Sequence, residues 1–299
     1  MNRFMTVAAG CALVGVAFGQ GSKREVMDTQ EDPPAIVQWA RGHAPDFAAG
    51  KVGAGKPVSL LTNHGGPILT TVQTKAIFWG TSWATDTSDK ISGIDSFFNG
   101  VGGTGYIGTN SEYGGAATGT IQHNSHVIDS TAAPGGSPST GVILGEVCKM
   151  VPNPDTNGNG FYAVYIDKPR GHASYCAWHS KGSCGGTPVQ FAFFFKLDGD
   201  AGCDPGGATG TTGTTAHSQG LAAIANVTGH ELSETVTDPH LDAWFDGQGQ
   251  ENADKCAWTF GSTLLTFGDA STWKIQGNWS NNAYQASTGY AKGGCIDHQ

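Results

Sequence analysis

Three stretches of the chain concentrate hydrophobic residues in the manner of β-strands. They span residues 71–79, 161–166 and 189–195, and all three are rich in aromatic and β-branched side chains. We therefore expect them to be the central strands of a sheet. Residues 100–140, by contrast, are rich in Gly, Ser and Thr and carry only short strand-like runs.

Two other apolar runs favour helices. In residues 85–99, the apolar side chains recur at helical spacing, and Thr87 or Ser88 is a suitable cap. A second run predicts a helix over residues 142–150.

The longest predicted helix covers residues 219–237. Ser218 is a suitable N-cap, and Pro239 cannot continue a helix. At about 100° per residue, five apolar or small side chains form one stripe, while His230 and Glu234 lie together on the opposite side. The stripe comprises Leu221, Ile224, Ala225, Thr228 and Leu232. One side of this helix is therefore suited to packing, and the other carries an imidazole and a carboxylate.

The N-terminus has the features of an export signal. Arg3 supplies a positive charge, the residues up to Phe18 are almost entirely apolar or small, and Ala17-Phe18-Gly19 fits a cleavage site. We therefore expect a signal peptide over residues 1–19. The alternative is a lipoprotein that carries its lipid on Cys11, which leaves a very short apolar run before the cysteine. The apolar run is too short to span a bilayer comfortably, so no membrane span is expected.

The rest of the chain predicts one domain. Residues 20–55 are polar and rich in Lys, Asp, Pro and Gly, which is typical of a linker or pro-segment. We place a single folded domain at residues 56–299.

The number of cysteines indicates the cellular compartment of the protein, and its net charge bears on its binding partners. Six cysteines remain after the signal, at positions 148, 176, 184, 203, 256 and 295, and an even number in an exported protein predicts three disulfides. We expect Cys256 to pair with Cys295 and the other four to form two bridges. The formal net charge is −9 and no block of Lys or Arg occurs, so no nucleic-acid partner is expected. The predicted localisation is secreted, either extracellular or periplasmic.

The predicted long helix carries the start of a zinc-hydrolase signature. His230 and Glu231 open it, and Glu234 occupies the place where the signature has its second histidine. Two ligands one helical turn apart can reach the same ion, and the adjacent Glu231 can reach a bound water as a general base. The simpler interpretation, that these are ordinary polar residues on an exposed helix face, stays open.

Two carboxylates downstream complete the predicted site. Glu251 follows His230 by 21 positions and is the third predicted ligand, and Asp254 suits a partner that orients His230. His240, ten positions after His230, is an alternative third ligand. His64 and His179 are further candidates that complete the site or line its cleft, or that make structural hydrogen bonds, and Asp238 is a cleft candidate.

The order of several segments resembles the phosphate-induced, EXORDIUM-like family of secreted proteins, found in plant cell walls and in microbes. The strongest match is His230-Glu-Leu-Ser-Glu234-Thr-Val-Thr-Asp238-Pro239, and other matches include 61–67, 77–80, 161–166, 176–179, 190–194, 243–245 and 251–256. The resemblance covers the chain from about residue 58 onward. It implies an extracellular protein with a metallopeptidase-like helix, and it carries onto His230, Glu231, Glu234, Glu251 and Asp254. Plant members tend to have Asn where this chain has Asp238.

These features predict an α+β, zincin-like fold, in which a mixed, largely antiparallel sheet packs against the metal-site helix. The first functional hypothesis is a secreted zinc peptidase that acts on a peptide or cell-wall substrate. The second is a non-catalytic extracellular or cell-wall binding protein, in which the same cluster holds zinc or calcium structurally or forms a hydrogen-bond network.

Overall fold

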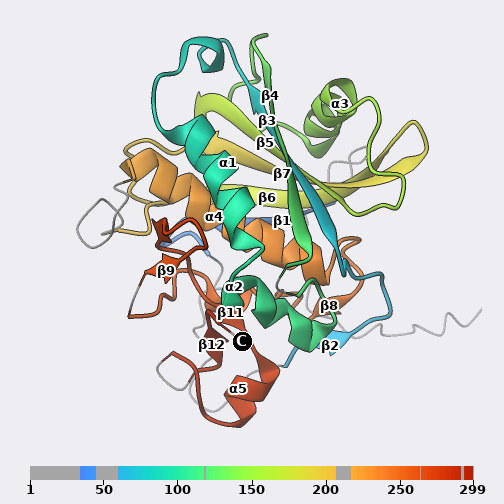
Figure 1. Cartoon of the computed structure of the whole chain (residues 1–299), viewed down its shortest axis with the longest axis vertical. Helices are drawn as coiled ribbons and strands as arrows, with labels where there is room; N and C mark the ends of the chain where they lie inside the picture. The colour runs from blue at the N-terminus through green and yellow to red at the C-terminus, as the bar shows by residue number, and fades with distance from the viewer. Residues whose placement is uncertain are drawn as a thin grey trace, which may run out of the picture.

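The computed structural model describes residues 34–44, 60–117, 119–206, 217–262, 264–290 and 293–298. Within these residues, six strands form one sheet in the order β1-β6-β7-β5-β3-β4 (Figure 1). The strands are β1 (Ala35–Trp39), β3 (Val72–Trp79), β4 (Ile121–Asp129), β5 (Gly160–Pro169), β6 (Tyr175–Cys184) and β7 (Thr187–Lys196). The three strands expected from the sequence are β3, β5 and β7, and they are neighbours in the middle of the sheet.

The strand directions are mixed. β3 pairs in parallel with β4 and β5, and β5 pairs in parallel with β7, whereas β6 is antiparallel to both β7 and β1. Three two-stranded sheets are antiparallel, and they join β2 (Thr62–Asn63) to β8 (Trp244–Phe245), β9 (Leu265–Thr266) to β10 (Thr272–Trp273), and β11 (Asn278–Trp279) to β12 (Cys295–Ile296). Within the large sheet, parallel strand pairs are more numerous than antiparallel ones. Over all strand pairs of the described residues, antiparallel ones are more numerous. The expected α+β class is confirmed.

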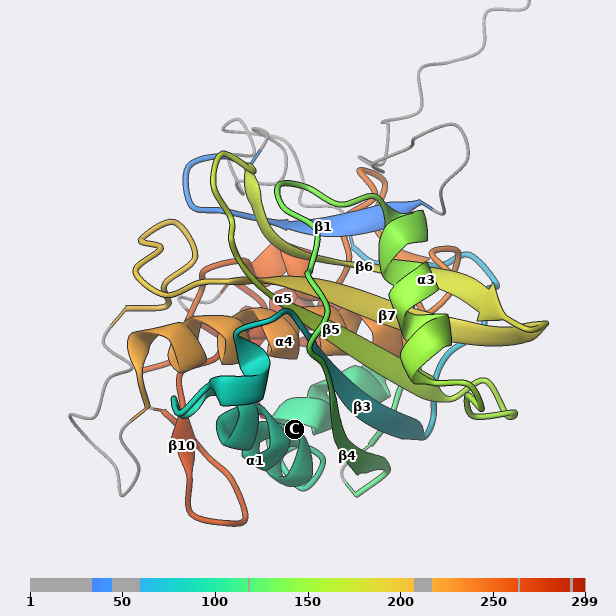
Figure 2. The same ribbon diagram turned by 90° about the horizontal axis from the view of Figure 1, so that it is seen from above.

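Helices cover both faces of the large sheet. The helices are α1 (Lys90–Val101), α2 (Gly105–Gly108), α3 (Thr140–Met150), α4 (Gln219–Thr237) and α5 (Asn281–Gln285), and three 3-10 turns are η1 (Trp83–Thr85), η2 (Thr109–Tyr113) and η3 (Asp254–Cys256). α1 and α4 pack on one face and α3 on the other (Figure 2). The helix predicted for residues 142–150 is α3. The helix predicted for residues 85–99 begins later, at Lys90, with Asp89 and not Thr87 or Ser88 as its N-cap residue. The Asp89 side chain makes no capping hydrogen bond in α1.

α4 begins and ends where the sequence predicted. The Ser218 hydroxyl accepts a hydrogen bond from the backbone N–H of Leu221 at 3.1 Å, and the last helical residue is Thr237. The Asp89 carboxylate accepts hydrogen bonds from both the backbone N–H and the hydroxyl of Ser218, which ties α1 to the start of α4. The two helices cross closely at Gly93, where a Cβ atom would lie 2.2 Å from Cδ2 of Leu221. Only glycine fits there without a shift of Leu221.

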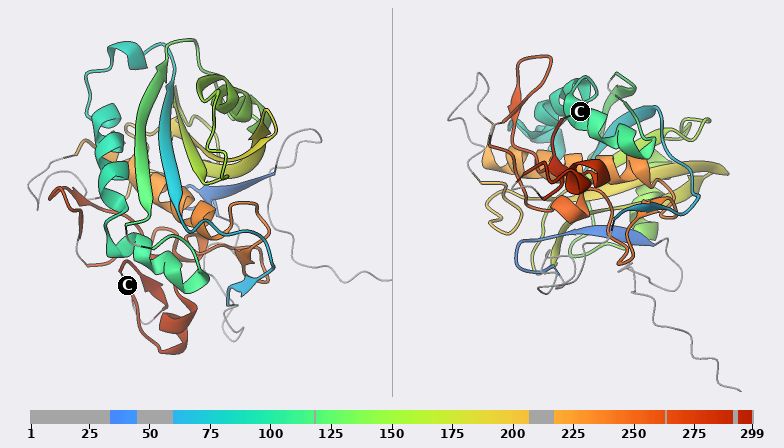
Figure 3. Two further views of the ribbon diagram at one scale, coloured as in Figure 1. Left: turned by 45° about the vertical axis from the view of Figure 1, so that its right-hand side comes forward. Right: turned by 90° about the horizontal axis from the view of Figure 1, so that it is seen from below.

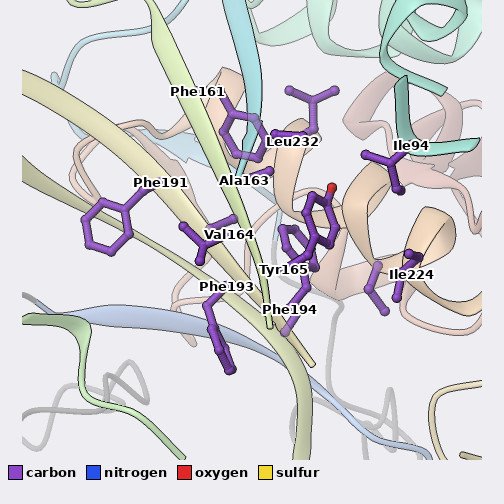
Figure 4. Close-up of a cluster of buried hydrophobic side chains, with 14 of the residues drawn as sticks. Ile94, Phe161, Ala163, Val164, Tyr165, Phe191, Phe193, Phe194, Ile224 and Leu232 are labelled. Atoms are coloured by element: carbon purple, nitrogen blue, oxygen red, sulfur yellow. The ribbon is translucent and has the colours of Figure 1, made fainter. Parts of the chain in front are cut away.

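The core between the sheet and α4 is aromatic. The ring of Tyr165 stacks between those of Phe78 and Phe194, and its hydroxyl lies 2.9 Å from that of Thr228 in α4. Figure 4 shows Tyr165 on the side of Ile224, while Phe191 lies on the other side of the strands. Both faces of the central strands are therefore buried, which explains their near-continuous apolar sequence.

The N-terminal strand β1 is an integral edge of the large sheet. Its Ile36 pairs with His179 of β6, and the side chain of Gln38 is fully buried. Residues 35–39 lie within the range 20–55 that the polar composition marked as a linker or pro-segment, so this part of the range belongs to the folded sheet. Residues 20–33 and 45–55 of that range, and the predicted signal peptide, lie outside the described residues.

Three disulfides join the described elements. Cys148 pairs with Cys184, Cys176 with Cys203, and Cys256 with Cys295, which confirms the predicted pairing of the last two and the two bridges among the other four. Such a set is typical of extracellular proteins. The segment after α4 forms the end of the molecule opposite α3 (Figure 3). In the part of the chain that the structure describes, no helix has the length and apolar character needed to cross a membrane.

Candidate metal centre

α4 presents three titratable side chains to one buried point. His230, Glu231 and Glu234 occupy consecutive turns of the helix, and all three are completely shielded from solvent. His230 Nε2 lies 3.0 Å from Oε1 of Glu234, as the spacing of four residues predicts. Buried charged groups of this kind are retained only where they are paired or bind an ion.

A fourth group comes from the sheet. His179 of β6 faces α4, and its Nδ1 atom lies 3.0 Å from Oε2 of Glu231 and 3.4 Å from Oε2 of Glu234. The other ring nitrogen, Nε2, lies 3.7 Å from Oε2 of Glu251. His179 is therefore central to the cluster, whereas the sequence marked it, with His64, as a further candidate that completes the site, lines its cleft or makes a structural hydrogen bond.

The two downstream carboxylates close the cluster from the opposite side. Glu251 and Asp254 lie before and at the start of η3, and the backbone N–H of Asp254 donates to Oε1 of Glu234 at 2.8 Å. The backbone N–H of Glu251 donates to Oδ2 of Asp254 at 3.2 Å. Asp254 Oδ1 lies 3.6 Å from Nε2 of His230, which is beyond hydrogen-bond distance, so the orienting role expected of Asp254 stays a prediction.

Two overlapping groups have ligand atoms close enough to share one ion. The first is His179, Glu234 and Glu251, and the second is His230, Glu231 and Glu234; in each group the ligand atoms lie within 4.8 Å of one another. Glu234 belongs to both. Neither group contains both His230 and Glu251, which the sequence placed around the same ion, so that ligand set stays a prediction.

Gln276 distinguishes between the two groups. Its amide nitrogen donates to the carbonyl of Ala253 at 2.8 Å and lies 3.0 Å from Nδ1 of His230. Its amide oxygen accepts from Gln38 at 3.0 Å and from the backbone N–H of Trp258 at 3.3 Å, so partners fix both ends of the amide. Nδ1 of His230 therefore accepts a hydrogen bond, and in the neutral ring the proton sits on Nε2, the nitrogen that faces the carboxylates.

His179 has the opposite arrangement. Its Nδ1 donates to the Glu231 carboxylate, so in the neutral ring Nε2 carries the lone pair. A carboxylate that holds the far nitrogen of a histidine is the usual support for a metal-binding imidazole. The hydrogen bonds of the two histidines thus favour the group of His179, Glu234 and Glu251.

The fit to an ion is supported by buried polar atoms that lack partners. Nε2 of His179, Nε2 of His230, Oε1 of Glu231 and Oε2 of Glu234 make no hydrogen bond of good geometry to any described residue. Leaving a buried polar group unsatisfied costs about 1–3 kcal/mol, and more when it is charged. A cation among these atoms would remove that cost. Nitrogen and carboxylate oxygen donors suit zinc and other first-row divalent ions.

The carboxylates and imidazoles shift the pKa values of one another. Burial raises the pKa of Glu231 to about 7, against the opposing effect of its hydrogen bond with His179. For Glu234, burial is outweighed by the charge of His230 and by hydrogen bonds to both histidines, and its pKa falls to about 2. Burial likewise opposes a charge on His179, but hydrogen bonds to Glu231 and Glu234 raise its pKa to about 9. Burial raises the pKa of Asp254.

The remaining predicted residues lie elsewhere. His64 stacks on Phe245 with ring centroids 3.6 Å apart. Asp238 is the C-cap residue of α4. Its carboxylate accepts hydrogen bonds from the backbone N–H groups of Asp242 and Ala243. His240 lies beside Gln190, 3.2 Å from its amide. These contacts are structural, and none of the three residues belongs to either ligand group.

A small pocket reaches the cluster at Asp254. Its volume is about 360 Å³, and its walls include Trp39, Arg41, Asp254 and Trp258. The Arg41 guanidinium lies over the Trp258 ring, 4.4 Å from its centroid. The side chain of Asp254 is 13% exposed, whereas those of His179, His230, Glu231, Glu234 and Glu251 are fully buried. This pocket is therefore the approach to the cluster that lies closest to solvent.

Comparison with known proteins identifies no relative: no family model, no curated protein and no solved structure matches this chain.

Proposed function

We propose that this protein is an extracellular, metal-dependent hydrolase. One observation carries the proposal: two imidazoles and three carboxylates are fully buried around one point, and several of their nitrogen and oxygen atoms have no hydrogen-bond partner. A purely structural polar network would satisfy these atoms. A site that binds a cation and a substrate would not.

His179, Glu234 and Glu251 are the residues that would hold the ion. Glu231 fixes the tautomer of His179, and the backbone N–H of Asp254 fixes Glu234. When bound, a zinc ion supplies Lewis acidity toward a carbonyl group and lowers the pKa of water. Two carboxylates among three ligands reduce the net charge of the site, and this weakens that effect relative to a site with three histidines.

Glu231 is suited to accept a proton from the attacking water. Its Oε2 atom is engaged by His179, while Oε1 has no hydrogen-bond partner. Burial raises the Glu231 pKa to about 7, so the carboxyl group can take up and release a proton near neutral pH. This is the role that the His-Glu start of the motif predicts.

Peptide bonds are the proposed substrate. The resemblance of the α4 motif, which begins with His230 and Glu231, to that of metallopeptidases supports this choice. The approach pocket of about 360 Å³ accommodates a small group and not a folded chain. An extended peptide lying across its mouth, with one side chain inserted, fits this size.

The test combines elemental analysis with one conservative variant. Purified protein should contain one zinc per chain, and it should cleave fluorescently labelled casein in a reaction that a chelator stops. Glu231→Gln should retain the ion, because the Gln oxygen can still accept from His179, and should lose at least about 100-fold in rate. Glu112→Gln in η2, outside the cluster, is the control. Full activity of Glu231→Gln would refute the mechanism.

A non-catalytic role is the second candidate, and the full burial of the cluster favours it. Structural metal sites are closed, whereas catalytic sites keep an open position. In that case the chain would be an extracellular binding protein, and zinc or calcium would only stabilise it. A tightly bound ion whose removal lowers the melting temperature, in a protein that cleaves no peptide, would select this role.

A further inference from the structure

A second and larger cavity lies on the face of the sheet opposite α4. Its volume is about 710 Å³, within the range of small-molecule sites, and it is formed by β3, β4 and the segment between α3 and β5. Gln73 and Lys75 of β3 alternate with Val72 and Thr74, which are buried. α3 packs on β5, β6 and β7, as Figure 2 shows. The cavity is lined by residues of the outer strands β3 and β4. We call it the amide groove.

Side-chain amides dominate the lining of the amide groove. Six of them line it, namely Gln73, Gln122, Asn124, Asn153, Asn157 and Asn159. The amide of Gln73 donates to Gln122 at 3.1 Å and accepts from Asn124 at 3.0 Å, so these side chains hold one another in place across β3 and β4. Each amide has two donor hydrogens and an acceptor oxygen with two lone pairs, so each retains capacity to bind a ligand.

The amide groove has little net charge. Lys75 and Asp155 are the charged residues in its lining, and their charges are opposite. The Asp155 carboxylate accepts from the backbone N–H of Asn159 at 2.8 Å and from the Asn157 amide at 3.4 Å, so it closes the Asn-Gly turn at residues 157–158. A phosphorylated or nucleic-acid ligand needs a basic surface, which this groove lacks.

Apolar atoms interrupt the polar lining. Met150 and Pro152 contribute them at the end of α3, and Tyr162 adds its ring. The Tyr162 hydroxyl accepts from the backbone N–H of Asp155 at 2.9 Å, which fixes the ring. A preorganised site of paired amides and small apolar surfaces matches a ligand with many hydroxyl groups and apolar C–H faces.

We propose that the amide groove binds a neutral oligosaccharide. Sugar hydroxyls both donate and accept hydrogen bonds, as do the six amides, and the absence of net charge selects against anionic polymers. The site is separate from the candidate metal centre, since none of its lining residues belongs to that cluster. The proposal that this groove binds a glycan is therefore independent of the proposed hydrolase activity.

The test uses isothermal titration with cellohexaose, chitohexaose and xylohexaose. At least one should bind with a dissociation constant below about 1 mM. The double variant Gln122→Ala/Asn124→Ala changes two exposed side chains on β4, so it should melt like the wild type while its affinity falls at least tenfold. Gln285→Ala, an exposed amide on α5, is the matched control and should bind normally. Chelator-treated protein should also bind normally.

Three results would overturn the proposal. The first is that none of the three oligosaccharides binds at millimolar concentration. The second is that binding persists unchanged in the double variant, which would place the sugar elsewhere. The third is that a sulfated oligosaccharide or an unrelated peptide competes as well as the neutral sugar, which would show that the groove is not selective for neutral glycans.

Discussion

His179 and Glu231 are 52 residues apart in sequence, yet Nδ1 of the imidazole and Oε2 of the carboxylate lie 3.0 Å apart in the buried interior. The contact joins the large sheet to the helix that covers it. It also sets the tautomer of His179, because the donating Nδ1–H leaves the lone pair on Nε2. The neighbouring His230 has the reverse arrangement, imposed by Gln276.

The two histidines should therefore differ in their effect on metal binding. We expect His179→Ala to reduce bound zinc to well below one ion per chain, whereas His230→Ala should retain most of it. Elemental analysis after gel filtration measures both. His64→Ala, which removes a ring stacked on Phe245, is the control for loss of a histidine. Equal loss of zinc in the His179 and His230 variants would contradict the tautomer argument.

Glu234 should be the most sensitive ligand, because both candidate groups share it. We expect Glu234→Ala to weaken zinc affinity at least tenfold, whichever group holds the ion. Competition with a chromogenic chelator gives the affinity. Glu146→Ala changes another buried glutamate, in α3, and controls for loss of a buried carboxylate in general. Unchanged affinity in Glu234→Ala would show that the ion, if present, binds elsewhere.

Zinc affinity should rise with pH. The hydrogen bonds of His179 to Glu231 and Glu234 raise its pKa to about 9 despite burial, so below pH 9 an ion must displace a proton from this ring. For one displaced proton, the affinity should increase about tenfold per pH unit between pH 7 and 9 and then level off. Titrations at fixed ionic strength measure the slope. A flat profile would mean that the ion does not bind through His179.

Stability should depend on pH through Asp200. Burial opposes its charge, but Arg170 donates to both carboxylate oxygens, at 2.7 and 3.1 Å, and the net effect lowers the Asp200 pKa. The stabilisation is therefore present above the unfolded pKa of about 3.9 and is lost as the pH falls through the lower folded value. We expect Asp200→Asn to cost about 1.5–3 kcal/mol at pH 7 and much less at pH 2.5.

Urea unfolding at the two pH values tests this expectation. Asp155→Asn, at the Asn-Gly turn beside the amide groove, provides a comparison in which no arginine is involved. A destabilisation of Asp200→Asn that is the same at both pH values would assign its effect to packing and not to the ion pair.

Local sequence patterns predicted most of the central elements of the fold. The limits of α4 follow from Ser218 and Pro239, and the central strands follow from their apolar runs. Strands β1 and β6 were not predicted. β1 is short and lies in a polar region, and it pairs with residues of β6 that are more than 130 positions away in sequence. Long-range pairing leaves no local signal.

The site was predicted in part, for the same reason. The helical spacing of His230 and Glu234 and the nearby Glu251 and Asp254 are local features, and the structure brings all of them together. The central place of His179 depends on the register of β6 against β7. The sequence offered it only as one of several candidate histidines, in a segment that matches the EXORDIUM-like order. Nothing in the sequence marks Gln276, whose role depends on contacts with three separate segments.

The position of β1 has a practical consequence for anyone who expresses this protein. A fragment that starts at residue 56 would leave the outer backbone groups of β6 without their antiparallel neighbour, directly beside His179. Unpaired strand edges recruit strands from other molecules. Such a fragment should self-associate, so expression boundaries belong upstream of Pro34. A protease that cuts away this strand would expose the same edge of β6 and promote aggregation.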